Sequence, residues 1–129
     1  MADLLIIDDD LDAAAILAEI MEMKGHTVRV GYDGQEGLEL VQARKPDLVL
    51  LDVEMPHLSG PGMAYRMMVH DMGLEDVPIV LLSGLVGLAG VAAQVGTPYF
   101  LSKPYRYEPV LAIVDRALAE HVSPHPSPA

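Results

Sequence analysis

Near its N-terminus the chain carries an apolar run that leads into three carboxylates, Leu4-Leu5-Ile6-Ile7-Asp8-Asp9-Asp10. A second run, Leu48-Val49-Leu50-Leu51, leads into Asp52, and a third, Phe100-Leu101-Ser102, leads into Lys103. Runs this short and this rich in leucine, isoleucine and valine are typical of buried strands in a parallel sheet. Ligands of such sheets bind outside the carboxyl ends of the strands. The charged residues at the three strand ends are therefore expected to meet in one crevice.

The predicted crevice gathers the carboxylates of Asp8, Asp9 and Asp52 with the ammonium group of Lys103 beside them. Carboxylates held close together repel one another unless a cation lies between them. The combination therefore indicates a site for a divalent metal ion next to a lysine, which suits phosphoryl chemistry. Taken alone, the run Asp8 to Asp10 would indicate no more than a helix cap, because acidic residues are common at helix N-termini.

The composition indicates one globular domain. The chain has 129 residues, of which 51% are apolar and 21% are charged; this length is enough for a substantial core. The formal net charge of −11 argues against binding to nucleic acids or to anionic membranes, which requires basic surface. The chain has no cysteine, which excludes disulfides, thiolate metal sites and cysteine nucleophiles. With neither a secretory signal nor an apolar stretch of about 20 residues, a cytoplasmic location is expected.

Strand-like and helix-like segments alternate five times along the chain. The expected strands are residues 3–8, 27–31, 48–52, 79–83 and 99–102. The first helix is expected to be capped by Asp9 or Asp10, and the spacing of Asp33 and Glu36 predicts a capping box for the second. Later helices are expected from about Met63 to Asp71, over residues 85–95, and along an apolar stripe from Val110 to His121. Such alternation predicts an α/β fold, with helices on both faces of a parallel sheet.

The C-terminal residues differ in composition from the rest. From Ser123 to Ala129 the chain alternates proline with small or polar residues, which cannot continue a helix. The expected organisation is therefore one domain over residues 1–121 and a disordered tail over residues 122–129.

Taken together and in this order, the motifs resemble the receiver domain of two-component response regulators. The resemblance covers about residues 3–121. It rests on separated motifs, namely Asp8-Asp9, Asp52 with Met55-Pro56 and Gly60 behind it, Ser83, and Lys103-Pro104. Each motif is weak alone, but the set at these spacings is specific. The resemblance implies a flavodoxin-like, doubly wound (βα)5 fold whose five parallel strands have the order 2-1-3-4-5.

The resemblance also implies roles for individual residues around a magnesium ion. Asp52 matches the aspartate that receivers phosphorylate. Asp9 matches the residue that ligates Mg²⁺ directly, and Asp8 matches its neighbour, which usually holds the metal through water. The backbone carbonyl of Glu54 matches the third protein ligand. Mg²⁺ is the implied cofactor, with Mn²⁺ as the alternative.

The remaining matched residues surround the phosphoryl group. Ser83 matches the residue whose hydroxyl group hydrogen-bonds to it, and Lys103 matches the lysine that pairs with it. The peptide bond between Lys103 and Pro104 is a candidate for the cis form, by analogy with the family. Phe100 matches the aromatic switch position, so that Ser83 and Phe100 are the expected switch residues.

The chain departs from the family in one segment. Gly84 stands where most receivers carry a small residue such as alanine, and the stretch from Ser83 to Lys103 is somewhat short. Between Leu85 and Val95 the only strongly polar side chain is that of Gln94, although an exposed helix should be polar on one face. The segment is therefore expected to be either buried or an interaction patch, and the latter is compatible with a homodimer through this fourth-helix face.

The implied function is a phosphorylation-dependent signalling switch that is not an enzyme beyond its own phosphorylation and dephosphorylation. Its partners would be a histidine kinase or a histidine phosphotransfer protein, and a downstream protein target, since the sequence shows no output domain. One alternative is an interaction module that keeps the fold and no longer switches. Another is a phosphohydrolase of the haloacid-dehalogenase type, which typically has Asp-x-Asp where this chain has Asp52-Val53-Glu54.

Overall fold

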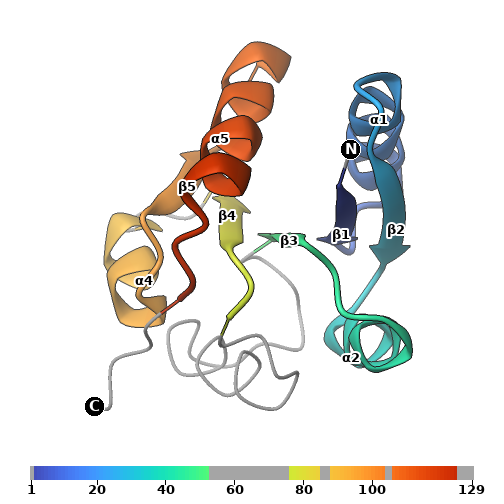
Figure 1. The fold of residues 1–129 in the computed structure, drawn as a ribbon, viewed down its shortest axis with the longest axis horizontal. Coiled ribbons are helices and arrows are strands. Elements are labelled where there is room, and N and C mark those ends of the chain that lie inside the picture. Colours follow the sequence, from blue (N-terminus) through green and yellow to red (C-terminus); the bar gives the residue numbers. More distant parts are fainter. Residues whose placement is uncertain (1, 53–75, 85–87, 104–105, 125–129) are drawn as a thin grey trace.

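The protein contains a five-stranded parallel sheet flanked by helices. The computed structural model describes residues 2–52, 76–84, 88–103 and 106–124. Its strands are β1 (Asp3–Ile7), β2 (Thr27–Gly31), β3 (Leu48–Asp52), β4 (Ile79–Ser83) and β5 (Tyr99–Ser102). They lie in the order β2-β1-β3-β4-β5, from right to left in Figure 1, and every neighbouring pair is parallel. The predicted doubly wound fold and its strand order are confirmed.

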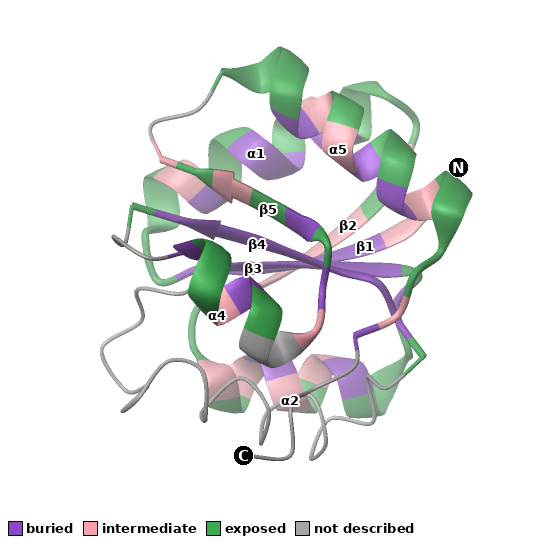
Figure 2. Cartoon of the chain, turned by 90° about the vertical axis from the view of Figure 1, so that its left-hand side faces the viewer, coloured by how far each residue is buried: buried purple, intermediate pink, exposed green. Residues whose placement is uncertain are grey.

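The described helices form a layer on each face of the sheet. They are α1 (Leu11–Met23), α2 (Gly34–Ala43), α4 (Leu88–Val95) and α5 (Tyr107–Glu120). Figure 2 shows α1 and α5 on one face of the sheet and α2 and α4 on the other. The helix expected from Met63 to Asp71 lies outside the described residues. Within the described ranges, no helix has the length and apolar character that crossing a bilayer requires.

Aspartate side chains fix the starts of two helices. Of the two candidates for the first helix, Asp10 is the cap, and its carboxylate accepts a hydrogen bond from the Ala13 N–H. Asp33 caps α2 by accepting from the Glu36 N–H at 2.8 Å. The predicted capping box is only half right, because the Glu36 carboxylate accepts from the Tyr32 N–H instead of the Asp33 N–H. The cap residue is thus confirmed at α2, but the reciprocal bond lies one residue earlier.

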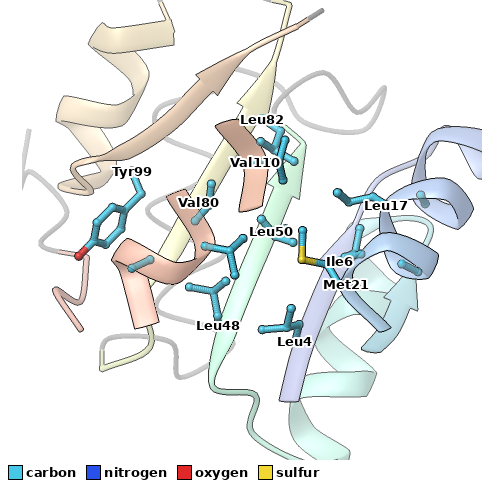
Figure 3. Packing of buried hydrophobic residues seen from close by; sticks show 14 residues of the cluster. Leu4, Ile6, Leu17, Met21, Leu48, Leu50, Val80, Leu82, Tyr99 and Val110 are labelled. Atoms are coloured by element: carbon cyan, nitrogen blue, oxygen red, sulfur yellow. The ribbon is translucent and has the colours of Figure 1, made fainter. Parts of the chain in front are cut away.

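The core consists of two apolar layers, one on each face of the sheet. Alternate residues of the central strands point to opposite faces, so Leu4, Ile6 and Leu50 pack against α1 and α5, whereas Leu5 and Ile7 pack against α2 and α4. Figure 3 shows the first layer, in which Leu17 and Met21 of α1 contact the sheet beside Ile6. Both faces of β3 and β4 are buried along their whole length, which is why these strands are apolar throughout.

The two C-terminal helices contact the core unequally. In α4, Leu88 and Ala92 are buried against the sheet, and its exposed described residues are the small ones, Ala89, Gly90 and Ala93. In α5 the predicted apolar stripe is buried at Val110, Val114 and Ala117. The predicted stripe was wrong at its last residue, His121. This residue is exposed and forms the C-terminal cap of the helix in the left-handed conformation, with φ of 54°.

The close packing of α2 predicts a stability effect at Gly37. A Cβ atom there would lie 2.6 Å from Cδ1 and 3.1 Å from Cγ1 of Ile7, a fully buried residue. We expect Gly37→Ala to lower the free energy of unfolding by about 1–2 kcal/mol, because overpacking outweighs the gain in helix propensity. Urea denaturation measures the change. The matched control is Gly90→Ala in α4, which meets no atom within 4 Å and should be neutral or stabilising; a stabilising Gly37→Ala would contradict the packing.

Candidate functional site

Asp8 and Asp52 lie side by side at the carboxyl ends of the two central strands. The register pairs Ile7 of β1 with Leu51 of β3, so the residue that follows each is also adjacent. Both aspartates are buried among the strand ends, with only 2% of Asp8 and 3% of Asp52 exposed. Two carboxylates shielded from water and close together repel each other strongly. Their placement therefore favours a positive charge nearby or a proton on one of the two carboxyl groups.

Asp9 completes a cluster of three carboxylates. One oxygen from each of Asp8, Asp9 and Asp52 lies within 4.8 Å of the others, and Asp9 is the exposed member. Hard cations such as Mg²⁺ prefer carboxylate oxygens and keep several of their own waters. A site with two buried carboxylates and one open to solvent fits that preference, because the ion would have protein oxygens on one side and water on the other.

Lys103 supplies a positive charge to the same cluster. Its Nζ atom lies 3.3 Å from Oδ2 of Asp52 and 3.6 Å from Oδ2 of Asp8, and its side chain is 24% exposed. Because β4 separates β5 from β3, and neighbouring strands lie about 4.8 Å apart, only a long side chain can span this distance. Among the described residues, this one ammonium group lies beside three carboxylates, so negative charge exceeds positive charge in this part of the site.

The pKa of the Asp8 carboxyl is raised from 3.8 to about 6. Burial is the largest cause, because it disfavours the charged form, and the nearby Asp52 carboxylate adds to the increase. The Asp10 N–H donates to Oδ1 of Asp8 at 2.9 Å, and this hydrogen bond and the charge of Lys103 act in the opposite direction. The protein thus binds a proton at Asp8 more tightly when folded than when unfolded.

This raised pKa predicts how stability depends on pH in the absence of metal. With a folded pKa above the unfolded one, the Asp8 carboxylate destabilises the fold at pH values above about 6. The penalty shrinks as the pH falls from about 6 towards 3.8. We expect Asp8→Asn to raise the free energy of unfolding at pH 7.5 by about 1–2 kcal/mol and to have little effect near pH 4. Urea denaturation at both pH values in the presence of a chelator measures this, and an equal gain at both would refute the electrostatic cause.

The other residues predicted for the site lie at the end of β4, within β5 or outside the described residues. Ser83 is fully buried at the end of β4, and its carbonyl accepts a hydrogen bond at 2.8 Å from the Lys103 N–H. Phe100 is 36% exposed on the edge strand β5. Glu54 and Pro104 lie outside the described residues. The hydrogen bond from the Asp10 N–H to the Asp8 carboxylate was not predicted from the sequence. Aspartates commonly accept a hydrogen bond from the amide two residues further along the chain, so this pattern could have indicated it.

Comparison with known proteins agrees with this geometry. The family described as "Response regulator receiver domain" matches residues 4–115. The chain belongs to the response regulator receiver domain family. Receiver domains are signalling modules of two-component systems, and phosphorylation and magnesium binding at an acidic cluster are typical of them. The chain is therefore a receiver domain with an acidic pocket.

Individual relatives support the assignment over nearly the whole chain. Protein Rrf1 of Nitratidesulfovibrio vulgaris is 36% identical over 97% of this chain and 88% of its own length. Response regulator MprA of Mycobacterium sp. strain KMS is 32% identical over 97% of this chain and 54% of its own length, so the chain spans about half of that regulator. A CheY-like receiver domain protein from Methanospirillum hungatei has the same fold, with a TM-score of 0.83 at 20% identity over 94% of this chain and 96% of its own.

Proposed function

We propose that this receiver domain is a phosphorylation-dependent signalling switch that accepts a phosphoryl group on Asp52 with the help of Mg²⁺. One observation carries the proposal. Oxygens of Asp8, Asp9 and Asp52 lie within 4.8 Å of one another, and the Lys103 ammonium group is 3.3 Å from Asp52. A carboxylate nucleophile beside a hard-cation site and a lysine has the groups that phosphoryl transfer requires.

Each residue would have a distinct part in the transfer. An oxygen of Asp52 attacks the phosphorus atom, a P–O bond forms, and the bond from phosphorus to the donor's leaving group breaks. A bound Mg²⁺ would neutralise negative charge in the pocket and on the transferring oxygens. Asp9 and Asp52 would hold the ion directly and Asp8 through water, with the Glu54 carbonyl as a further ligand. The Lys103 ammonium group and the Ser83 hydroxyl would hydrogen-bond to the phosphoryl oxygens.

The same switch would need a phosphodonor, a downstream partner and residues that respond to phosphorylation. The donor would be a histidine kinase or a histidine phosphotransfer protein in the cytoplasm, and the output a contact with a downstream protein. Phe100 and Ser83 would be the residues that report phosphorylation, and a cis bond before Pro104 would orient Lys103. The domain would extend over residues 1–121, with residues 122–129 as a tail. The small exposed residues of α4 would form a contact surface, including one for a second copy of the chain.

A direct test is labelling by acetyl phosphate, a small phosphodonor that replaces the kinase. We expect covalent phosphorylation in the presence of Mg²⁺ and none when the metal is chelated. A module that no longer switches would remain unlabelled under both conditions. A phosphohydrolase would instead release phosphate continuously from a phosphate ester such as p-nitrophenyl phosphate, so that sustained turnover of this compound would contradict the proposal.

Removal of the Lys103 side chain should separate metal binding from signalling. A cation cannot ligate Mg²⁺, but it can pair with phosphoryl oxygens. We therefore expect Lys103→Ala to keep its Mg²⁺ affinity, or to gain some through the loss of a competing positive charge, while it loses most of the conformational change after phosphorylation. Amide NMR spectra with Mg²⁺, before and after addition of beryllofluoride, measure both effects. An unchanged response to the mimic would exclude this role for Lys103.

A further inference from the structure

The two oxygens of the Asp8 carboxylate have different surroundings. Oδ1 accepts the hydrogen bond from the Asp10 N–H at 2.9 Å, and Oδ2 faces the Lys103 ammonium group at 3.6 Å. A carboxylate turns about its terminal bond with little resistance, because sp³–sp² torsions are broad. The hydrogen bond from the Asp10 amide therefore fixes the orientation of the carboxylate plane, so that one oxygen lies on the amide and the other faces the lysine.

Asp10 is itself held in place by the first turn of α1. Its backbone has the extended conformation of a helix cap, with φ of −84° and ψ of 104°. Its carboxylate accepts from the Ala13 N–H at 3.1 Å, and its carbonyl accepts from the Ala14 N–H at 3.0 Å. One bond through the side chain and one through the backbone thus join Asp10 to the first turn of the helix. Because the amide that holds Asp8 belongs to this same residue, the cap and the orientation of Asp8 are mechanically linked.

We propose that Asp10 is a positioning residue for the metal and phosphoryl site, and that its side-chain cap holds the amide that orients the Asp8 carboxylate. This inference rests on the proposed function of the pocket. Asp10 is exposed and has no contact with the site through its own carboxylate among the described interactions. It acts through Asp8, whereas Asp8, Asp9 and Asp52 form the cluster itself.

Loss of the cap should weaken metal binding. Without the side-chain acceptor the first turn of α1 frays more readily, and the Asp10 amide then leaves Oδ1 of Asp8. Partners that orient metal ligands typically contribute about 10- to 100-fold to affinity. Since the substitution loosens the amide and does not remove it, we expect the Kd for Mg²⁺ to rise by a smaller factor, about three- to tenfold.

The experiment compares four variants with the parent by titration with Mg²⁺ alone, followed in amide NMR spectra. Asp10→Ala removes the cap, whereas Asp10→Asn and Asp10→Ser keep a capping oxygen and remove the charge. Asp33→Ala is the matched control, because the Asp33 carboxylate also accepts a hydrogen bond from the amide three residues on and its loss should reduce thermal stability similarly. We expect weaker binding for Asp10→Ala, and affinities close to the parent value for the other three.

Two results would overturn the inference. If Asp10→Ala and Asp33→Ala bind Mg²⁺ equally well, the Asp10 cap has only a structural role. If Asp10→Asn and Asp10→Ser lose as much affinity as Asp10→Ala, the charge of Asp10 acts on the ion and the cap does not. Should Asp10→Ala fail to fold, Asp10→Gly replaces it, since glycine starts helices at little cost but has no side-chain acceptor. Failure of the parent to bind Mg²⁺ would instead refute the proposed function.

Discussion

Replacement of Asp52 with asparagine is expected to abolish phosphorylation by acetyl phosphate. A carboxamide is not a nucleophile towards phosphorus, and Asp52 is the carboxylate that both ends a central strand and lies 3.3 Å from the Lys103 ammonium group. In the parent, the new bond would join an Asp52 oxygen to phosphorus, and acetate would leave. The loss should be complete within the sensitivity of mass spectrometry on the intact protein.

A neighbouring acidic residue provides the control for this loss. Asp12 is exposed in the first turn of α1 and lies outside the cluster of three carboxylates, so Asp12→Asn should be labelled as fully as the parent. Asp52→Asn should also remain folded, because it relieves repulsion with Asp8. If Asp52→Asn were still labelled to full yield, another residue would be the acceptor.

Replacement of Asp9 with alanine is expected to raise the Kd for Mg²⁺ by about 10- to 100-fold. Asp9 is the exposed member of the cluster and contributes one of its three close carboxylates. Its removal takes away one carboxylate ligand and one negative charge, and both contribute to the attraction of the site for Mg²⁺. The phosphorylation rate at a fixed Mg²⁺ concentration should fall in parallel, and the fall should be partly reversed at high Mg²⁺ concentration.

The Asp9 variant also allows a check that the protein is intact. Without metal, the loss of one of three neighbouring carboxylates should leave stability unchanged or slightly higher, because their mutual repulsion decreases. Titration followed by amide NMR spectra and urea denaturation with a chelator measure the two effects separately. Parent-like Mg²⁺ affinity in Asp9→Ala would show that this residue is not a metal ligand.

The strands were predictable from sequence because their residues are buried on both faces. A short apolar run such as Leu48 to Leu51 is typical of a strand that is buried on both faces. The end of this strand at Asp52 was predicted correctly. The same logic placed Asp8 and Lys103 at strand ends, and therefore at one edge of the sheet. The strand order could not be derived from the pattern and came from the family resemblance, since alternation alone does not say which strands are neighbours.

The predictions that were wrong or incomplete concern hydrogen bonds and helix ends, which depend on local geometry over a few residues. The sequence did not distinguish Asp9 from Asp10 as the cap, because both stand before the helix and either can accept an amide. The Glu36 carboxylate reaches the amide of Tyr32 and not that of Asp33, a choice made by side-chain rotamers. His121 fits the spacing of the apolar stripe, but the helix has already ended there in a left-handed residue.

The most direct test of the central claim is a crystal structure of the protein with Mg²⁺ and beryllofluoride, a phosphoryl mimic. The account predicts that the mimic is bonded to a carboxylate oxygen of Asp52 and that the metal ion contacts both Asp9 and Asp52. It also predicts that the Lys103 ammonium group lies within hydrogen-bond distance of the mimic. A mimic bound at another residue, or a metal ion without contact to Asp9 and Asp52, would contradict the account.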